Sequence, residues 1–283
     1  MFAIIGIVVV LGAVVGGYLL EGGNLSVLFQ PIEVLIILGA ALGAFAISAP
    51  QKVIIATVKE LLGVFTHKGP NKELYLELLL VMNELFRMAR RDGLISVEGH
   101  VNKPQDSAVF KKYPGVLVNE QVLSFLCDNL KVYITSGMEP KQMEEVMDTD
   151  LEAQEKEGLI PSTGVNRVAD ALPGLGIVAA VLGVVLTMGK ITEPPEVLGH
   201  SIGAALVGTF LGVLLCYGFA GPLAANMEHS HHERMGLLEV VRVGLLSTVA
   251  GAAPVVALEF ARRAIPLSER PSFEELEAVL RKG

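Results

Sequence analysis

The stretch that decides the fold is residues 171–188, which read ALPGLGIVAAVLGVVLTM and contain no charged side chain. The hydrocarbon core of a bilayer is about 30 Å thick, so a helix that crosses it needs about 20 mostly apolar residues. Working outward from this run, three more uncharged stretches approach that length: residues 2–20, 34–50 and 201–225. The sequence therefore predicts an all-α, polytopic membrane protein with four transmembrane helices.

The charged residues lie almost entirely between and after these stretches, where apolar residues recur with helical spacing in residues 74–88, 116–135, 140–157 and 235–250. Ser272 and Glu275 have the spacing of a capping box, which predicts a last helix. Almost no strand is expected. The predicted organisation is spans one and two with a short periplasmic link (1–50), a helical cytoplasmic domain (51–170), spans three and four (171–225) and a helical cytoplasmic tail (226–283).

Composition narrows the function classes. Hydrophobic residues make up 52% of the chain and charged residues 18%, with a mean hydropathy of +0.55, which disfavours a soluble domain. The net charge is −8 and no long basic run occurs, so nucleic acid is not an expected partner. Cys127 and Cys216 lie far apart and fit neither a disulfide framework nor a metal site.

Lysine and arginine set the orientation, because basic residues near span ends stay on the cytoplasmic side. Residues 51–170 hold fourteen and residues 227–283 hold seven, whereas the link 21–33 has none and the link 190–200 has one. Both long parts and both termini are therefore predicted to be cytoplasmic, in a multi-pass membrane protein. Small-xxx-small glycine pairs within the spans favour close helix packing, although glycine is common in membrane helices: Gly12/Gly16, Gly39/Gly43 and Gly208/Gly212.

None of the four predicted spans has an ionisable residue in its middle, so a solitary ion carrier is disfavoured. The spans offer hydroxyls, Thr187 and Thr209, and helix breakers, Pro173 and Pro222. Prolines near helix ends can also simply mark boundaries. Asp170 stands just before the third span.

Other chemistry is weakly represented. His229, His231 and His232 lack the carboxylate or cysteine partners of a metal site and are interpreted as a solvated juxtamembrane segment. No phosphate-binding loop, nucleophile elbow or HExxH motif occurs, so an enzyme and a bound cofactor are not expected. Residues 90–98, RRDGLISVE, place cations at a helix end and a carboxylate after it, which fits either a docking surface or simple helix-dipole compensation.

Several of these segments resemble one family. Residues 171–183 and 204–212, with Tyr217-Gly218-Phe219 and Gly221-Pro222-Leu223, strongly resemble the third and fourth spans of MotA/PomA flagellar stator proteins. The resemblance extends to residues 90–98, 109–114 and 270–277 and so covers the whole chain in order.

The resemblance implies a pentameric ring of such subunits around two single-span MotB-like chains, which supply the ion-carrying aspartate. It implies that Thr209 and the part of span three lined by Pro173 face that aspartate, that Pro222 couples its occupancy to movement, and that Arg90 and Glu98 engage the rotor protein FliG. Asp170, Ala180 and Thr187 are grouped with this ion pathway. Because Ala179-Ala180 stand where sodium-driven relatives tend to carry an extra hydroxyl, the expected ion is the proton.

Two alternatives remain at this stage. An ExbB/TolQ-type ring subunit has helices similar to spans three and four, but such chains usually have three spans in total. A passive membrane scaffold or a solitary transporter is the other class. The uncharged spans disfavour the transporter, and the Arg90 and Glu98 match disfavours the scaffold.

Overall fold

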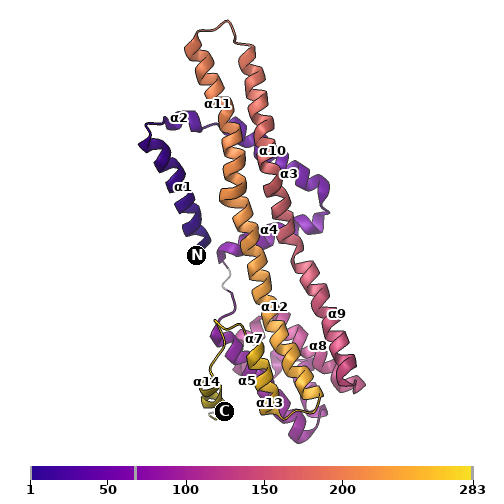
Figure 1. Ribbon diagram of the computed structural model, residues 1–283. Coiled ribbons are helices and arrows are strands. Elements are labelled where there is room, and N and C mark those ends of the chain that lie inside the picture. Colours follow the sequence, from indigo (N-terminus) through magenta and orange to yellow (C-terminus); the bar gives the residue numbers. More distant parts are fainter. Residues whose placement is uncertain (1, 67–68, 282–283) are drawn as a thin grey trace. The chain divides into compact units, whose positions relative to one another are not determined.

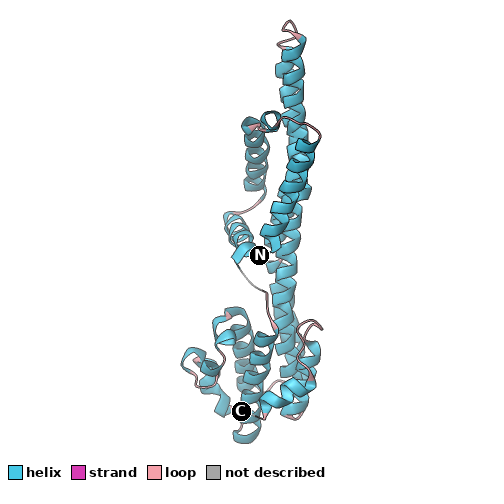
Figure 2. Ribbon diagram, turned by 90° about the vertical axis from the view of Figure 1, so that its left-hand side faces the viewer, coloured by secondary structure: helices cyan, strands magenta, loops and turns pink. Residues whose placement is uncertain are grey.

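The computed structural model describes residues 2–66 and 69–281, and all regular structure in these residues is helical (Figures 1 and 2). Four helices are long and apolar enough to cross a membrane. The predicted all-α class with four candidate spans is therefore confirmed. The chain forms two compact units: unit 1 holds residues 1–67 and 158–230, and unit 2 holds residues 68–157 and 231–283. The four-segment division made from the sequence stays a prediction.

Unit 1 contains the apolar helices α1 (Phe2–Leu20), α2 (Leu25–Leu28), α3 (Pro31–Ser48), α4 (Gln51–Thr66), α10 (Ile160–Met188), α11 (Pro195–Leu214) and the π-helical turn η3 (Leu215–Ala220). Helices α10 and α11 run side by side, and α3 and α4 both pack on α10 (Figure 1). Helix α1 has no buried residue. Large apolar side chains are exposed on most of these helices, which suits contact with lipid or with other membrane helices.

Unit 2 is a helical bundle built on α5 (Lys72–Asp92), α6 (Ile95–Asn102), α7 (Pro114–Val118), α8 (Glu120–Ser136), α9 (Pro140–Gly158), α12 (Gly221–Val249), α13 (Pro254–Ala264) and α14 (Phe273–Leu280), with short 3-10 turns at Pro104–Asp106 and Phe110–Lys112. Residues of α9 and α12 near the unit boundary belong to unit 1. The core centres on the fully buried Tyr75, Phe86 and Phe110. Complete burial of such side chains stabilises a fold by about 1.5–3 kcal/mol each.

Helix ends in unit 2 follow capping chemistry. Asn71 accepts from the backbone N–H of Leu74 at 3.0 Å, and Gly93 ends α5 with φ +87°, a conformation that favours glycine. The Ser272 capping box is present, which confirms the predicted last helix. One predicted helix, residues 116–135, is divided at Asn119, which caps α8. The helix predicted at 235–250 is confirmed over residues 235–249, although it forms the end of the longer α12.

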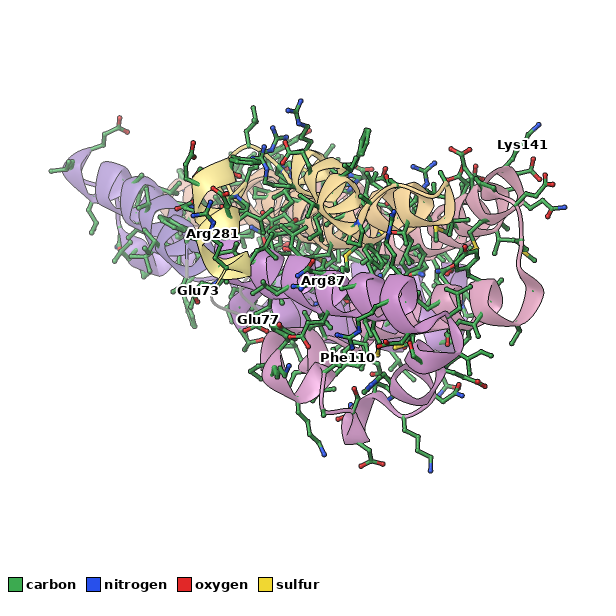
Figure 3. The ribbon with its side chains drawn as sticks, turned by 90° about the horizontal axis from the view of Figure 1, so that it is seen from below. Glu73, Glu77, Arg87, Phe110, Lys141 and Arg281 are labelled. Carbon is green, nitrogen blue, oxygen red and sulfur yellow. The ribbon has the colours of Figure 1, made fainter. Side chains whose placement is uncertain are left out.

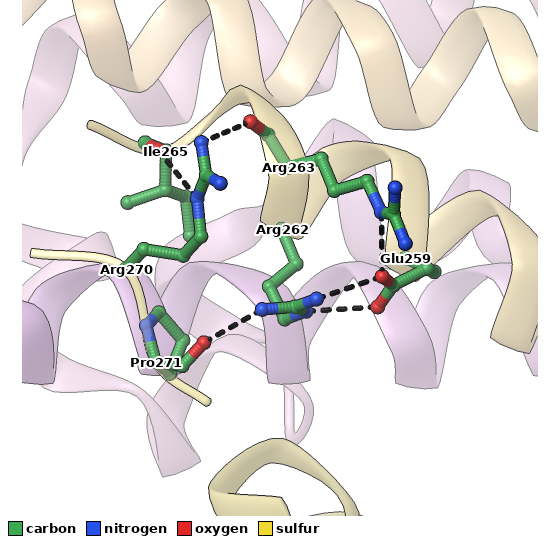
Figure 4. Close-up of polar contacts among 6 residues, drawn as sticks. All are labelled: Glu259, Arg262, Arg263, Ile265, Arg270 and Pro271. Atoms are coloured by element: carbon green, nitrogen blue, oxygen red, sulfur yellow. Dashed lines mark hydrogen bonds and ion pairs between the residues drawn. The ribbon is translucent and has the colours of Figure 1, made fainter. Parts of the chain in front are cut away.

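The segment after α13 is held to that helix by arginine side chains (Figure 4). Arg262 donates to both carboxylate oxygens of Glu259, at 2.7 and 2.8 Å, and to the carbonyl oxygen of Pro271 at 2.9 Å. Arg270 donates back to the carbonyl oxygens of Ile265 and Arg263 at 3.0 and 2.6 Å. Charge-assisted bonds of this kind are roughly twice as strong as neutral ones. They position the chain that leads into α14.

Candidate membrane pathway and cytoplasmic surface

Helices α10 and α11 approach closely at the glycine seam, formed by Gly176 and Gly183 on α10 and Gly208 and Gly212 on α11. A Cβ atom on Gly176 would lie 2.7 Å from the carbonyl oxygen of Gly208, and one on Gly212 would lie 2.6 Å from the carbonyl oxygen of Leu172. The two backbones are therefore in contact, and only glycine leaves room for them. The seam fixes the register of α10 against α11.

The seam brings together two residues that the resemblance assigns to the ion pathway. Ala180 is buried, and its backbone nitrogen is 3.0 Å from the Cβ position of Gly208, the neighbour of the half-buried Thr209. Thr187 lies about 10 Å further along α10 at 1.5 Å per residue. Its buried hydroxyl donates to the carbonyl oxygen of Gly183 at 2.8 Å, a bond within its own helix. Thr187 is therefore not brought to Ala180 and Thr209.

The two prolines occur in different backbone settings. Pro173 lies in the interior of α10, which continues through it, and the nearby Asp170 is exposed. Pro222 is the second residue of α12 and follows the π-helical turn η3, in which Gly221 donates to the carbonyl of Cys216, five residues back. A wide turn next to proline relieves the clash that its ring would otherwise make with the preceding turn. Leu172 and Ala220 join one apolar cluster, so η3 packs beside α10 close to Pro173.

Glu33 was missed in the sequence analysis, which began the second span at Val34. Helix α3 begins at Pro31, and Glu33 lies in its first turn. Its Oε2 atom is buried and has no hydrogen-bond partner in residues 2–66 and 69–281. The predicted second span therefore began three residues late, whereas the observation that no span has an ionisable residue in its middle is unaffected, because Glu33 lies in the first turn of α3. A proline at the first helical position followed by a glutamate is a helix-start signal that would have moved the boundary.

The rotor-facing candidates lie in unit 2, on its surface. Arg90 is exposed at the end of α5 and donates to the carbonyl oxygen of Ala252 at 3.3 Å; Glu98 is exposed on α6. Arg90 borders an open hollow of about 450 Å³ whose lining is mainly basic: Arg87, Arg90, Arg91 and Lys112, with Glu84, Met88 and Pro254. Figure 3 shows Arg87 well separated from Lys141, the first lysine of α9. This surface can attract an acidic partner.

One of the three histidines differs from the interpretation as a solvated segment, whereas His229 and His232 are exposed. His231 is buried rather than solvated, and its Nε2 lies 3.2 Å from Oε2 of Glu155. Burial lowers the pKa of His231, and Glu155 acts against that change. In the part of the chain that the structure describes, no group of three His, Cys, Asp or Glu residues could hold a metal ion. His231 is thus part of the packing between α9 and α12.

Comparison with known proteins identifies the family. Residues 4–93 match the family described as motility protein A N-terminal, and residues 118–240 match the MotA/TolQ/ExbB proton channel family. Motility protein A of Escherichia coli (strain K12) is 41% identical over 281 residues, which cover 99% of this chain and 95% of that protein. The chain belongs to the MotA family. It is a multi-pass membrane protein of that family, and the match at residues 4–93 includes the first two candidate spans.

Other similar proteins also match almost the whole chain. Motility protein A of Salmonella typhimurium is 39% identical, with 99% of this chain and 95% of that protein covered. The flagellar MotAB stator complex from Bacillus subtilis contains a chain with 26% identity and a TM-score of 0.78, covering 97% of this chain and 100% of that one. A chain of C. jejuni MotAB, 22% identical with a TM-score of 0.79, has the same fold.

Proposed function

We propose that this chain is a stator subunit of a bacterial flagellar motor, which forms an ion channel with a MotB-like single-span partner and converts ion flow into torque on the rotor protein FliG. The observation that carries the proposal is the match along almost the entire chain to motility protein A of E. coli. The fold of the chain in the B. subtilis MotAB complex supports a partner of the MotB type. The role is non-enzymatic.

The assembly we propose is a pentamer of this chain around two partner helices, in the inner membrane with both termini in the cytoplasm. The distribution of lysine and arginine supports that orientation. The partner contributes an aspartate at the level of Thr209 and Pro173. Neutralising a buried carboxylate changes its interactions by several kcal/mol, and about 5.5 kcal/mol is enough to reverse a two-state equilibrium from 1:99 to 99:1.

The proton is the proposed ion, because Ala180 and its neighbour Ala179 add no hydroxyl to the seam. Swimming driven by this chain and its partner should continue without sodium and stop when a protonophore is added. Swimming that stops on sodium removal and survives the protonophore would exclude the proton as the driving ion.

The experiment that tests torque transfer is charge reversal of Arg90. Arg90 is exposed and donates to the carbonyl oxygen of Ala252 at 3.3 Å, so the loss of that hydrogen bond should cost about 1 kcal/mol or less of folding stability. Arg90→Glu should therefore abolish swimming while co-purification with the partner is unchanged. Lys141→Glu makes the same charge change on α9 and should swim normally. Normal swimming of Arg90→Glu would exclude this residue as a rotor contact.

The ExbB/TolQ-type alternative predicts a different phenotype. Loss of such a ring would impair outer-membrane energy transfer and leave swimming intact. The motility protein A match at residues 4–93 favours the stator. Deletion of the gene, followed by swimming and outer-membrane uptake assays, separates the two functions.

A further inference from the structure

The carboxyl group of Glu33 occupies an unusual place in unit 1. Glu33 lies in the first turn of α3, and the side chain as a whole is partly exposed. Its Oε2 atom is nevertheless buried without a hydrogen-bond partner in the described residues. A buried carboxylate oxygen without a hydrogen-bond partner is unfavourable, so this atom needs a specific explanation.

The carboxyl group reaches the glycine seam. A Cβ atom on Gly208 would lie 2.9 Å from Oε2, and one on Gly183 would lie 3.6 Å from Oε1. The same Cβ position on Gly208 is 3.0 Å from the backbone nitrogen of Ala180. Glu33 therefore fills the notch that two glycines leave between α10 and α11, beside Ala180 and next to Thr209.

No basic side chain lies on the turns of α10 and α11 that meet Glu33; the next basic residue after Gly183 is Lys190, beyond the end of α10 and about 10 Å along the chain at 1.5 Å per residue. The titratable groups on those helices are Arg167 and Asp170 on α10 and Glu196 and His200 on α11. Arg167 is separated from Gly183 by about 24 Å of helix, and His200 from Gly208 by about 12 Å, at 1.5 Å per residue. Burial without a basic partner disfavours the charged form of a carboxyl group, so this setting favours the protonated, neutral form.

The depth of Glu33 in the membrane suits a proton-binding group between the outer side and the aspartate of the proposed partner. Gly208 lies seven residues after Ser201, the start of the predicted fourth span, which is about 10 Å along the helix. We propose that Glu33 is a proton-binding group on the outward part of the ion pathway. Its carboxylate takes a proton from a hydronium ion and releases water; it then passes that proton inward, through water, to the partner's aspartate and becomes a carboxylate again.

The inference rests on the proposed function and is tested on the complete complex with its partner, reconstituted in liposomes that contain a pH-sensitive dye. Glu33→Gln keeps the shape but cannot carry a proton, so proton flux per complex should fall at least tenfold. Glu33→Asp should retain measurable flux. Glu196→Gln, an exposed glutamate at the start of α11, serves as the matched control and should conduct like the unaltered complex.

The outcomes separate the two proposals. No flux through the unaltered complex would refute the channel function itself. Flux through Glu33→Gln equal to that of the unaltered complex would overturn only the role of Glu33. The unaltered protein provides a second test that does not depend on folding of a variant: dicyclohexylcarbodiimide modifies protonated carboxyl groups in apolar surroundings, and peptide mass mapping should find the adduct on Glu33. An unmodified Glu33 would likewise overturn the proposal.

Discussion

The glycine seam makes a quantitative prediction for Gly212→Ala. The added Cβ would lie 2.6 Å from the carbonyl oxygen of Leu172 and 2.8 Å from the Cα of Gly176, both of them backbone atoms. Ordinary contact begins at 3.4 Å, so α10 and α11 would have to separate by about 0.8 Å. Overpacking of this kind costs about 1–3 kcal/mol. The substitution also raises helix propensity, which must be separated from the steric cost.

Gly199→Ala on the same helix provides that separation, because a Cβ at Gly199 meets nothing within 4 Å. Both substitutions gain the propensity of alanine, up to about 1 kcal/mol, so their difference isolates the overpacking cost. A cost of about 1–3 kcal/mol should make the locally opened state of unit 1 about 5- to 150-fold more populated in Gly212→Ala than in Gly199→Ala, since each 1.4 kcal/mol is a factor of ten.

Labelling of Cys216 can measure this opening, because the residue becomes accessible only when the helices separate. It is buried in the apolar cluster with Leu172, one turn beyond Gly212. In a Cys127→Ala background, the rate of Cys216 labelling by a maleimide, measured on the purified protein in detergent, follows local opening of α11 from α10. Equal labelling rates in the two glycine variants would refute the claim that the two backbones are in contact at Gly212.

Three further substitutions test other parts of the chain. Arg262 and Arg263 lower the pKa of Glu259 from an ordinary 4.5 to about 2. Glu259 should therefore stabilise unit 2 by about 1–2 kcal/mol above pH 4.5 and lose this contribution as the pH falls toward 2. In Glu259→Gln, the stability measured by circular dichroism should depend less on pH in this range. Burial lowers the pKa of His231 beside Glu155, so the unfolded chain binds a proton at this residue more readily than the folded chain does. The stability of the fold should therefore decrease as the pH drops below 6.5. His231→Phe should remove this pH dependence of the unfolding midpoint between about pH 8 and 5.5. Pro173→Ala should lower torque while leaving the amount of protein in the membrane unchanged, and its loss from the membrane would instead indicate a structural role.

The sequence predicted the parts of this fold that depend on composition and short-range chemistry. Four apolar runs gave four candidate spans, and the Ser272 capping box gave the last helix, because both signals are contained within one segment. Helix continuity was harder to predict. Helix α12 passes from apolar to charged residues without an end, and a change of composition is not a helix stop.

Packing between spans was predictable only in part. Three small-xxx-small pairs had the same spacing, yet a Cβ would meet nothing within 4 Å at Gly12, Gly16, Gly39 or Gly43 of the single chain. The Gly208/Gly212 pair does bring two backbones into contact. Spacing alone does not reveal which face of a helix has a neighbour. Glu33 was missed for a related reason, because a glutamate at the end of an apolar run resembles a boundary until the helix opposite is known.

The burial of Ala180 changes how its part in the pathway is to be understood. Only 8% of Ala180 is exposed, whereas the next residue, Val181, is 55% exposed on the outer face of α10. A partner helix on the exposed face would meet Val181 and reach Ala180 only at its edge. At the seam, the backbone nitrogen of Ala180 lies 3.0 Å and the methyl group of the fully buried Ala179 lies 3.2 Å from the Cβ position of Gly208, so a larger side chain at residue 179 would act first on the spacing of α10 and α11. Because Glu33 fills the same notch, we expect any effect of substitutions at residues 179 and 180 on ion flux to act through the packing around that carboxyl group more than through direct contact with the proposed partner.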